Sequence, residues 1–456
     1  MPLDRREFLI AASAAAVACK PESPDDTDAV AVPAPVRDPS PAPFEAPGPE
    51  DRDVFPRAVA LGDPTPDGVM VVVHSTADSV EVVLARHFEG AWAEAARFPA
   101  RETLGGSARF EVSGLDADTP YAAWAEVDGV RSRVTHFRTA PEPDVLRQVR
   151  FVATSCLGGA SDLANLSFMA DHDPDAVLLL GDTGYCDGNV TAGEYTAFWN
   201  AHARRDRVRD LFAAGAVVAT WDDHEVANNW VLGVAPNSLF TGVSQQQIDD
   251  ATDAWRSVVP MRLGPGGTGI WRTLRFGATL ELFVLDCRGE RSPGKIMSDT
   301  QLDWLVAALQ ASEAHFKVVL TSVHATDHFE LIGVVQDEDR WQGYTAQRAA
   351  LITAAAAVPG TVFVTGDMHY GAVQRLDPEG GAGADLREIA VGPAGSTLFP
   401  VPAIMELGGG PLPQYETVID DWTFSVIDFD PGLGTVRVQF VDDAGVVRVE
   451  QTLEGL

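Results

Sequence analysis

The sequence predicts an all-β sandwich followed by a larger α/β domain. Between residues 54 and 142, short runs of alternating polarity are separated by turn residues, which is typical of strands. From residue 145 onward, apolar β-branched runs alternate with helix-like segments such as Ser298–Ser312 and Tyr344–Ala357, which indicates α/β layering. With 456 residues the chain has room for both domains and for processed ends.

Residues 1–18 are expected to be an export signal. Arg5 and Arg6 precede a short apolar run, as in twin-arginine signals. The run ends at Ala16-Val17-Ala18-Cys19, which resembles a lipoprotein cleavage box. We therefore expect a folded protein that is exported to the periplasm or the cell surface, with a lipidated Cys19 as its only link to a membrane.

Residues 19–53 are expected to be a disordered tether. This stretch is acidic and rich in proline, and it lacks a periodic apolar face. A tether of this kind would hold a folded head away from the membrane.

The β domain, residues 54–142, is predicted from its strand pattern. A turn is expected at Gly62–Gly68. The segment Leu115–Tyr121 resembles the tyrosine corner of fibronectin-III-like sandwiches. No site chemistry is visible, so a packing or spacing role is expected. The predicted strands are Val69–His74, Val80–Ala85, Ala108–Val112, Tyr121–Val127 and Val134–Thr139.

The charge and the cysteine content exclude several classes of protein. Lys and Arg number 33 against 66 Asp and Glu, a net charge of −33, so binding to nucleic acid is not expected. A phosphate ester could still bind where bound cations make the local electrostatic potential positive. Four cysteines are too few for a disulfide scaffold, and the sequence leaves open whether Cys186 and Cys287 pair.

Five apolar runs each stop at a side chain that can bind a metal. Strands packed side by side in one sheet would bring these ends to one rim. Carboxylates, imidazoles, a phenol and a thiol at such a rim suit a two-metal hydrolase. The runs are Val149–Thr154 before Cys156, Ala176–Leu180 before Asp182, Ala216–Thr220 before Asp222, Val318–Val323 before His324, and Thr361–Thr365 before Asp367.

The individual rim residues have both a functional and a structural interpretation. Asp182 could bridge two cations, or it could cap a loop. Tyr185 favours Fe³⁺, because a tyrosine with a free pKa of about 10 needs a strong Lewis acid to ionise near neutral pH. Asp367 and His369 lie two residues apart and could share a metal. His324 alone could be a core histidine, and Cys156 could be a buried thiol.

The segment Asp222-Asp223-His224-Glu225 places four polar groups directly after an apolar run. Such a cluster is costly in a core unless metals or partners satisfy it. A compatible alternative is a helix N-terminus, with Asp222 as the cap and Glu225 as the third residue of a capping box.

Together these residues resemble the PhoD-like alkaline phosphatases of the calcineurin-like metallophosphoesterase superfamily. Most metallophosphoesterases carry an Asp-x-His motif, which the PhoD-like family replaces with Ser-Cys, here Ser155-Cys156. Their Gly-Asn-His-Glu motif becomes Asp-Asp-His-Glu in this family, so Asp223 takes the place of the asparagine. The resemblance implies that residues 145–450 form a metallophosphoesterase domain, a central β-sandwich flanked by helices. The matching segments are Phe55–Pro64, Thr220–Asn229, Leu285–Arg288, Gln301–Leu305 and Thr365–His369.

The resemblance also implies the metals and their ligands. Calcium fits hard oxygen ligands independently. His324 is not part of the family pattern, and as a ligand it would favour Zn²⁺ or Mn²⁺ at the second site. The implied ligands are Cys156, Asp182, Tyr185 and His369 for Fe³⁺, and Asp182, Asp223 and Asp367 for Ca²⁺.

The expected activity is hydrolysis of small phosphate monoesters, diesters or both, by a monomeric enzyme, through in-line attack of a metal-bound hydroxide. His224 would stabilise developing charge or protonate the leaving alkoxide, with Glu225 orienting it. Arg288 and Arg291 are candidate clamps for substrate oxygens, or else ordinary ion pairs. The alternatives are a phosphodiesterase or phospholipase, and a surface-binding lipoprotein on a decayed phosphatase scaffold.

Overall fold

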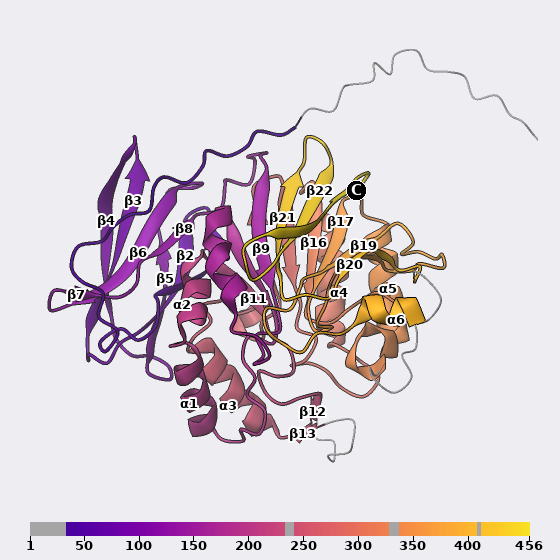
Figure 1. Cartoon of the computed structure of the whole chain (residues 1–456), viewed down its shortest axis with the longest axis horizontal. Helices are drawn as coiled ribbons and strands as arrows, with labels where there is room; N and C mark the ends of the chain where they lie inside the picture. The colour runs from indigo at the N-terminus through magenta and orange to yellow at the C-terminus, as the bar shows by residue number, and fades with distance from the viewer. Residues whose placement is uncertain (1–32, 233–240, 328–336, 408–411) are drawn as a thin grey trace, which may run out of the picture. The chain divides into compact units, whose positions relative to one another are not determined.

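Two mixed β-sheets carry most of the strands (Figure 1). The computed structural model describes residues 33–232, 241–327, 337–407 and 412–456, which belong to one compact unit. The first sheet has nine strands in the order β23-β22-β21-β9-β10-β11-β1-β2-β5. In that order they are Val447–Leu453, Thr435–Val441, Phe424–Asp430, Val149–Thr154, Ala176–Leu180, Val217–Thr220, Ala60–Thr65, Gly68–His74 and Ser107–Ser113.

The second sheet has seven strands in the order β14-β15-β16-β17-β19-β18-β20. Strands β9, β10 and β11 are mutually parallel in the first sheet, as are β15, β16, β17 and β19 in the second. The strands of the second sheet, in that order, are Arg272–Phe276, Leu280–Val284, Phe316–Thr321, Thr361–Thr365, Arg387–Ala390, Gly371–Arg375 and Tyr415–Ile419.

The core between the two sheets is apolar and buried. Phe151 and Leu178 of the first sheet belong to the same cluster as Leu282, Val318 and Val364 of the second. A strand that is buried on both faces has apolar residues at successive positions. These segments therefore show no alternation of polar and apolar residues in the sequence.

Helices cover the outer faces of both sheets, so the predicted α/β layering is confirmed. Trp199 and Trp255 belong to the outer core of the first sheet, and Leu305 and Leu351 to that of the second. The helices expected around residues 298–312 and 344–357 are present as α4 and α5. The helices are α1 (Ala192–His202), α2 (Asp206–Ala213), α3 (Gln245–Arg256), α4 (Asp299–Ala311), α5 (Thr345–Ala356) and α6 (Val401–Leu407).

The expectation of one common sheet for the five apolar runs is wrong. Strands β9, β10 and β11 lie in the first sheet, whereas β16 and β17 lie in the second. A buried run fits a parallel sheet and a two-sheet sandwich equally well, so periodicity cannot separate them. Strand β16 also ends at Thr321, and His324 therefore lies in the following loop.

The N-terminal β region forms two layers, one of which is continuous with the first sheet. A five-stranded sheet contains β4-β3-β6-β7, with β8 on β6, while β1 pairs in parallel with β11. The phenol oxygen of Tyr121 accepts a bond from the Asp116 amide at 2.9 Å, as in a tyrosine corner. The fibronectin-III class and a domain boundary at 142–145 stay predictions. The strands are β3 (Val80–Phe88), β4 (Ala91–Ala100), β6 (Pro120–Val127), β7 (Val130–Arg131) and β8 (Thr135–Arg138).

One local expectation in this region is wrong, and one strand was not predicted. Strand β1 continues to Thr65, so the turn expected at Gly62–Gly68 is shorter. Strand β4 was not expected, because its sequence lacks a strand-like alternation and most of its side chains are exposed at least in part. It pairs with β3 through a bulge between Leu84 and Ala85.

The expected disordered tether is wrong for residues 33–53, which lie against the folded body. The Ala34 amide donates to Asp430 at 2.9 Å, and Arg37 pairs with Asp175 at 3.2 Å. The Phe44 ring lies 5.3 Å from that of Trp124. In a proline-rich segment the backbone groups outside regular secondary structure remain available to bond with other parts of the protein.

Residues 1–32, including the predicted signal and Cys19, lie outside the described residues. No described helix has the length and hydropathy needed to span a bilayer.

Candidate metal centre

The carboxyl ends of β9, β10, β11 and β17 meet at one edge. The Cys156 amide donates to the Gly181 carbonyl at 3.2 Å, which joins the loops after β9 and β10. A Cβ at Gly366 would lie 2.6 Å from the Leu180 carbonyl oxygen and 2.9 Å from Ser155 Cβ. Glycine at 366 therefore lets the end of β17 approach the first sheet closely.

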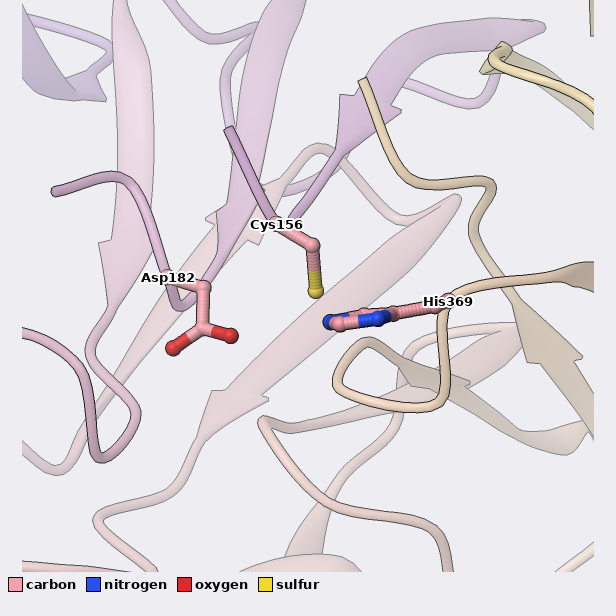
Figure 2. Close-up of side chains that lie close together, drawn as sticks. All are labelled: Cys156, Asp182 and His369. Carbon is pink, nitrogen blue, oxygen red and sulfur yellow. The ribbon is translucent and has the colours of Figure 1, made fainter. Parts of the chain in front are cut away.

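Three overlapping groups of ligand atoms lie at this edge, each within 4.8 Å. In the first group, Cys156, Asp182 and His369 point toward one another (Figure 2). Asp182 and Asp223 each belong to two groups, so each is placed to bridge neighbouring cations. The other two groups are Asp182, Asp223 and His224, and Asp222, Asp223 and Asp367.

Four of these residues have left-handed backbone conformations. The φ angles are 55° at Cys156, 55° at Asp182, 69° at Asp367 and 56° at His369. Each such non-glycine residue costs on the order of 1 kcal/mol or more and persists only where its surroundings fix it. Their clustering indicates that ligand placement, and not local stability, determines these turns.

The charges of the cluster are balanced only in part by protein cations, because Arg288 and His224 face a larger number of carboxyl groups. Burial and the neighbouring Asp223 and Asp222 raise the pKa of Asp182 well above its usual range, although His224 opposes this. Burial, with Asp339 and Asp222, likewise raises the pKa of Asp367. Packing so many carboxyl groups together is costly unless cations neutralise them. The donor set of thiol, phenol, imidazole and carboxylates therefore fits metal ions.

Two candidate iron ligands, His369 and Tyr185, are oriented by the surrounding loops. His369 Nδ1 donates to the Thr397 carbonyl at 2.8 Å, which leaves Nε2 for a metal. The Tyr185 hydroxyl donates to Asp182 at 3.2 Å. Burial, with the charges of Asp182 and Cys156, raises the pKa of the Tyr185 phenol, so only a strongly acidic cation would ionise it.

Comparisons with known proteins identify the family of this chain. The family model described as PhoD-like phosphatase matches residues 151–406, more than half of the chain. The chain belongs to the PhoD-like phosphatase family. It is 25% identical over 375 residues to alkaline phosphatase D of Bacillus subtilis (strain 168), covering 69% of this chain and 64% of that relative. The chain thus spans just under two thirds of the length of that relative.

Two solved structures share the fold. The structure of PhoD has a TM-score of 0.73 and 20% identity, with 91% of this chain and 92% of that chain covered. The purple acid phosphatase PPD1 from yellow lupin (Lupinus luteus) seeds has a TM-score of 0.59 and 14% identity, with 88% and 74% covered. Both structures are under 25% identical to this chain, so they support the shared fold.

The third rim imidazole, His224, is held by a residue that the sequence did not single out. Its Nδ1 lies 2.6 Å from Asp187 Oδ2, and its ring stacks on Tyr185 with centroids 4.1 Å apart. The Asn228 amide donates to the other Asp187 oxygen at 2.6 Å. Burial lowers the pKa of His224, but the carboxylates of Asp182, Asp223 and Asp187 outweigh it and raise the pKa to about 11.

The expected role of Glu225 in orienting His224 is wrong. Its buried carboxylate accepts bonds from the amides of Asp182 at 3.0 Å, Thr183 at 2.6 Å and Asp222 at 2.9 Å. The bond to Asp222 is one half of a capping box, but residues 222–229 form turns and no helix follows. Glu225 therefore fixes the backbone of two ligand loops, because its side chain points inward.

The expected role of Arg288 and Arg291 as substrate clamps is also wrong. Arg288 has no exposed side-chain area, and it bonds the two oxygens of Asp222 at 2.7 and 2.9 Å. Its remaining nitrogen binds Asp339. Arg291 donates to the backbone carbonyls of Cys287 at 3.0 Å and Asp339 at 2.9 Å. Both guanidinium groups are engaged by carboxylates and carbonyls of the protein, so they hold the acidic loops in place.

His324 lies in a polar cluster of the core and in none of the three ligand groups of the described chain. Its Nδ1 is 3.0 Å from Gln374 Nε2 and 3.4 Å from the Tyr370 hydroxyl. The structure thus gives no support to His324 as a ligand.

The open question of a Cys186–Cys287 disulfide is also answered, since both are free, buried thiols.

A pocket of about 240 Å³ opens over the ligand groups. Its lining combines carboxylates and asparagines with the apolar side chains of Met368 and Phe399. Residues lining it from the candidate centre are Asp182, Asp223, His224, Asp367 and His369. A small molecule could therefore reach the ligand edge directly.

Proposed function

We propose that the chain is a metal-dependent phosphoesterase that hydrolyses small phosphate monoesters, diesters or both. The observation that carries the proposal is the sharing of Asp182 and Asp223 between neighbouring groups of ligand atoms at the floor of a pocket. Two adjacent cations on shared carboxylates can stabilise both the attacking and the leaving oxygen in phosphoryl transfer to water. Membership of the PhoD-like phosphatase family supports the same reaction class.

The donor chemistry favours different cations at the two positions. Cys156, Tyr185 and His369, with Asp182, would hold Fe³⁺, because a phenol with a raised pKa ionises only on a strong Lewis acid. Asp182, Asp223 and Asp367 would hold Ca²⁺ through hard oxygens. When bound, these cations would supply the Lewis acidity that activates water and neutralises the phosphoryl oxygens.

His224 would act on the reacting oxygens. Asp187 engages Nδ1 at 2.6 Å, which leaves Nε2 as the nitrogen available to substrate in the pocket. Burial lowers the pKa of His224, but Asp182, Asp223 and Asp187 raise it to about 11 in the chain without cations, and the contact with Asp187 would still favour the charged imidazolium once cations occupy Asp182 and Asp223. It would stabilise charge on a phosphoryl oxygen or give its proton to the leaving alkoxide.

Substrate attraction must come mainly from the cations. The described lining of the pocket contains four aspartates and no arginine or lysine. With a chain charge of −33, an ester phosphate is repelled until cations occupy the carboxylates. Phosphate ester hydrolysis should therefore depend fully on metal.

We also propose that the enzyme is exported as a lipoprotein. The support is Arg5-Arg6 and the cleavage box before Cys19. Mass spectrometry of the protein recovered from membranes tests this. A lipid-modified Cys19 at the mature N-terminus is expected, and an unprocessed Met1 contradicts the proposal.

The test of activity uses purified protein stripped of metal by a chelator and then reloaded with Fe³⁺, with Ca²⁺, or with both. Rates are compared on an aryl phosphate monoester and on the matching diester. Hydrolysis of at least one ester is expected only with both cations. Absence of hydrolysis with every cation, including Zn²⁺ and Mn²⁺, would contradict the proposal.

A further inference from the structure

The buried hydroxyl of Ser396 touches the loops of two candidate iron ligands. Ser396 follows β19, is 3% exposed, and its Oγ lies 2.5 Å from the Tyr185 hydroxyl oxygen. The same Oγ lies 3.0 Å from the Cys156 carbonyl and accepts from the Gly158 amide at 3.1 Å. One side chain thus connects the thiol loop with the phenol.

Glycine at 158 makes this contact possible. A Cβ at that position would lie 2.5 Å from Ser396 Oγ and 3.1 Å from Ser396 Cα. No real Cβ tolerates the shorter of these distances. The loop after β9 is therefore shaped to admit the Ser396 hydroxyl beside Tyr185.

The single proton of Ser396 has two possible acceptors. A serine hydroxyl donates once, so its proton goes either to the Cys156 carbonyl or to the Tyr185 oxygen. The Cys156 carbonyl already accepts from the amides of Gly395 at 3.1 Å and Ser396 at 3.0 Å. If the Ser396 hydroxyl no longer donated to the Cys156 carbonyl, that carbonyl would still accept two hydrogen bonds. The hydroxyl proton can therefore point toward Tyr185 instead.

We propose that Ser396 is a positioning residue for Tyr185 and donates a hydrogen bond to the Tyr185 oxygen when Tyr185 binds a cation as phenolate. The Tyr185 hydroxyl donates its own proton to Asp182, and a phenolate can only accept, so Ser396 is the donor of the bond between Ser396 and Tyr185. The proposal rests on the proposed Fe³⁺ site. The bond holds the phenolate in place and lowers its electron density.

Absorption spectroscopy of the Fe³⁺-loaded protein tests this directly. A phenolate bound to Fe³⁺ gives a charge-transfer band, and removing a hydrogen-bond donor makes the phenolate easier to oxidise. Ser396→Ala should therefore shift the band to longer wavelength. The matched control is Ser161→Ala, because Ser161 donates to the Ala394 carbonyl at 3.0 Å without bonding Tyr185. The control should keep the wild-type band.

A wild-type band in both variants would overturn the proposal and leave the iron site standing. A wild-type protein that hydrolyses esters without such a band would overturn the proposal but not the hydrolase activity. Resonance Raman spectra of the wild type in H₂O and D₂O need no variant. A shift of the phenolate modes on deuteration is expected, and unshifted modes contradict the proposal.

Discussion

Asp187 Oδ2 lies 2.6 Å from His224 Nδ1, although 37 residues separate them in the chain. The Asn228 amide fixes the other Asp187 oxygen at 2.6 Å, so the carboxylate is held from both sides. The pair engages Nδ1 and leaves Nε2 available in the pocket that His224 lines. This relationship gives the phosphoesterase proposal a specific proton donor.

Asp187→Asn should lower kcat by about 10- to 100-fold with little change in bound metal, because it removes the carboxylate that orients and charges His224. Steady-state kinetics with elemental analysis check this. The matched control is Asp443→Asn, at an exposed position. Equal kcat in the two variants would contradict a role for Asp187.

Cys156→Ser should weaken Fe³⁺ binding by at least about tenfold, because a thiolate ligand is replaced by a hydroxyl that does not ionise. Calcium content should change little. Cys287→Ser is the control, since Cys287 is a free, buried thiol outside the three ligand groups. Competition with a chelator measures both affinities. Iron retention by the Cys156 variant at wild-type affinity would remove Cys156 from the ligand set.

Arg288→Met should destabilise the metal-free protein by about 3–5 kcal/mol, because it leaves Asp222 and Asp339 buried without their cation. Urea unfolding followed by fluorescence measures the change. A substrate clamp would instead raise KM and leave stability almost unchanged, and that result would restore the role predicted from the sequence.

His202 should make the protein less stable in mild acid. Burial, helped by Arg205, lowers the pKa of this buried imidazole to about 4, against about 6.5 when unfolded. The unfolded state therefore binds the proton first, and stability falls as pH drops from 6.5 toward 4, by roughly 2 kcal/mol at pH 4.5. Urea unfolding of metal-free wild type and His202→Gln at pH 7 and pH 4.5 checks this. The variant should lose less stability than the wild type over that interval, and an equal loss would contradict the assignment.

Much of the fold could be predicted from local patterns. The run Ala176–Leu180 and the segment Ser298–Ser312 have the length and composition of a buried strand and a capped helix, and both form as expected. The division of the strands between two sheets could not be predicted, because a strand that is buried on both faces has the same sequence pattern in either arrangement.

The candidate site was predictable where a residue directly follows a strand. Asp182 and Asp223 lie together because the parallel strands β10 and β11 end at one edge, and Asp367 approaches Asp223 from the second sheet. Roles that depend on distant partners could not be predicted. Ser396 is 211 residues from Tyr185, and only the folded chain shows that they touch. The charges of Arg288 and Glu225 suggested a substrate clamp and a catalytic residue, respectively, but burial assigns both to holding the loops.

The most direct test of the central claim is elemental analysis of three folded proteins, namely wild type, Asp182→Asn and Cys156→Ser. Asp182 is shared by two ligand groups, whereas Cys156 belongs to one. Our prediction is iron and calcium in the wild type, loss of both in Asp182→Asn, and loss of iron alone in Cys156→Ser. A wild-type protein without either metal, or an Asp182→Asn variant that keeps both, would contradict it.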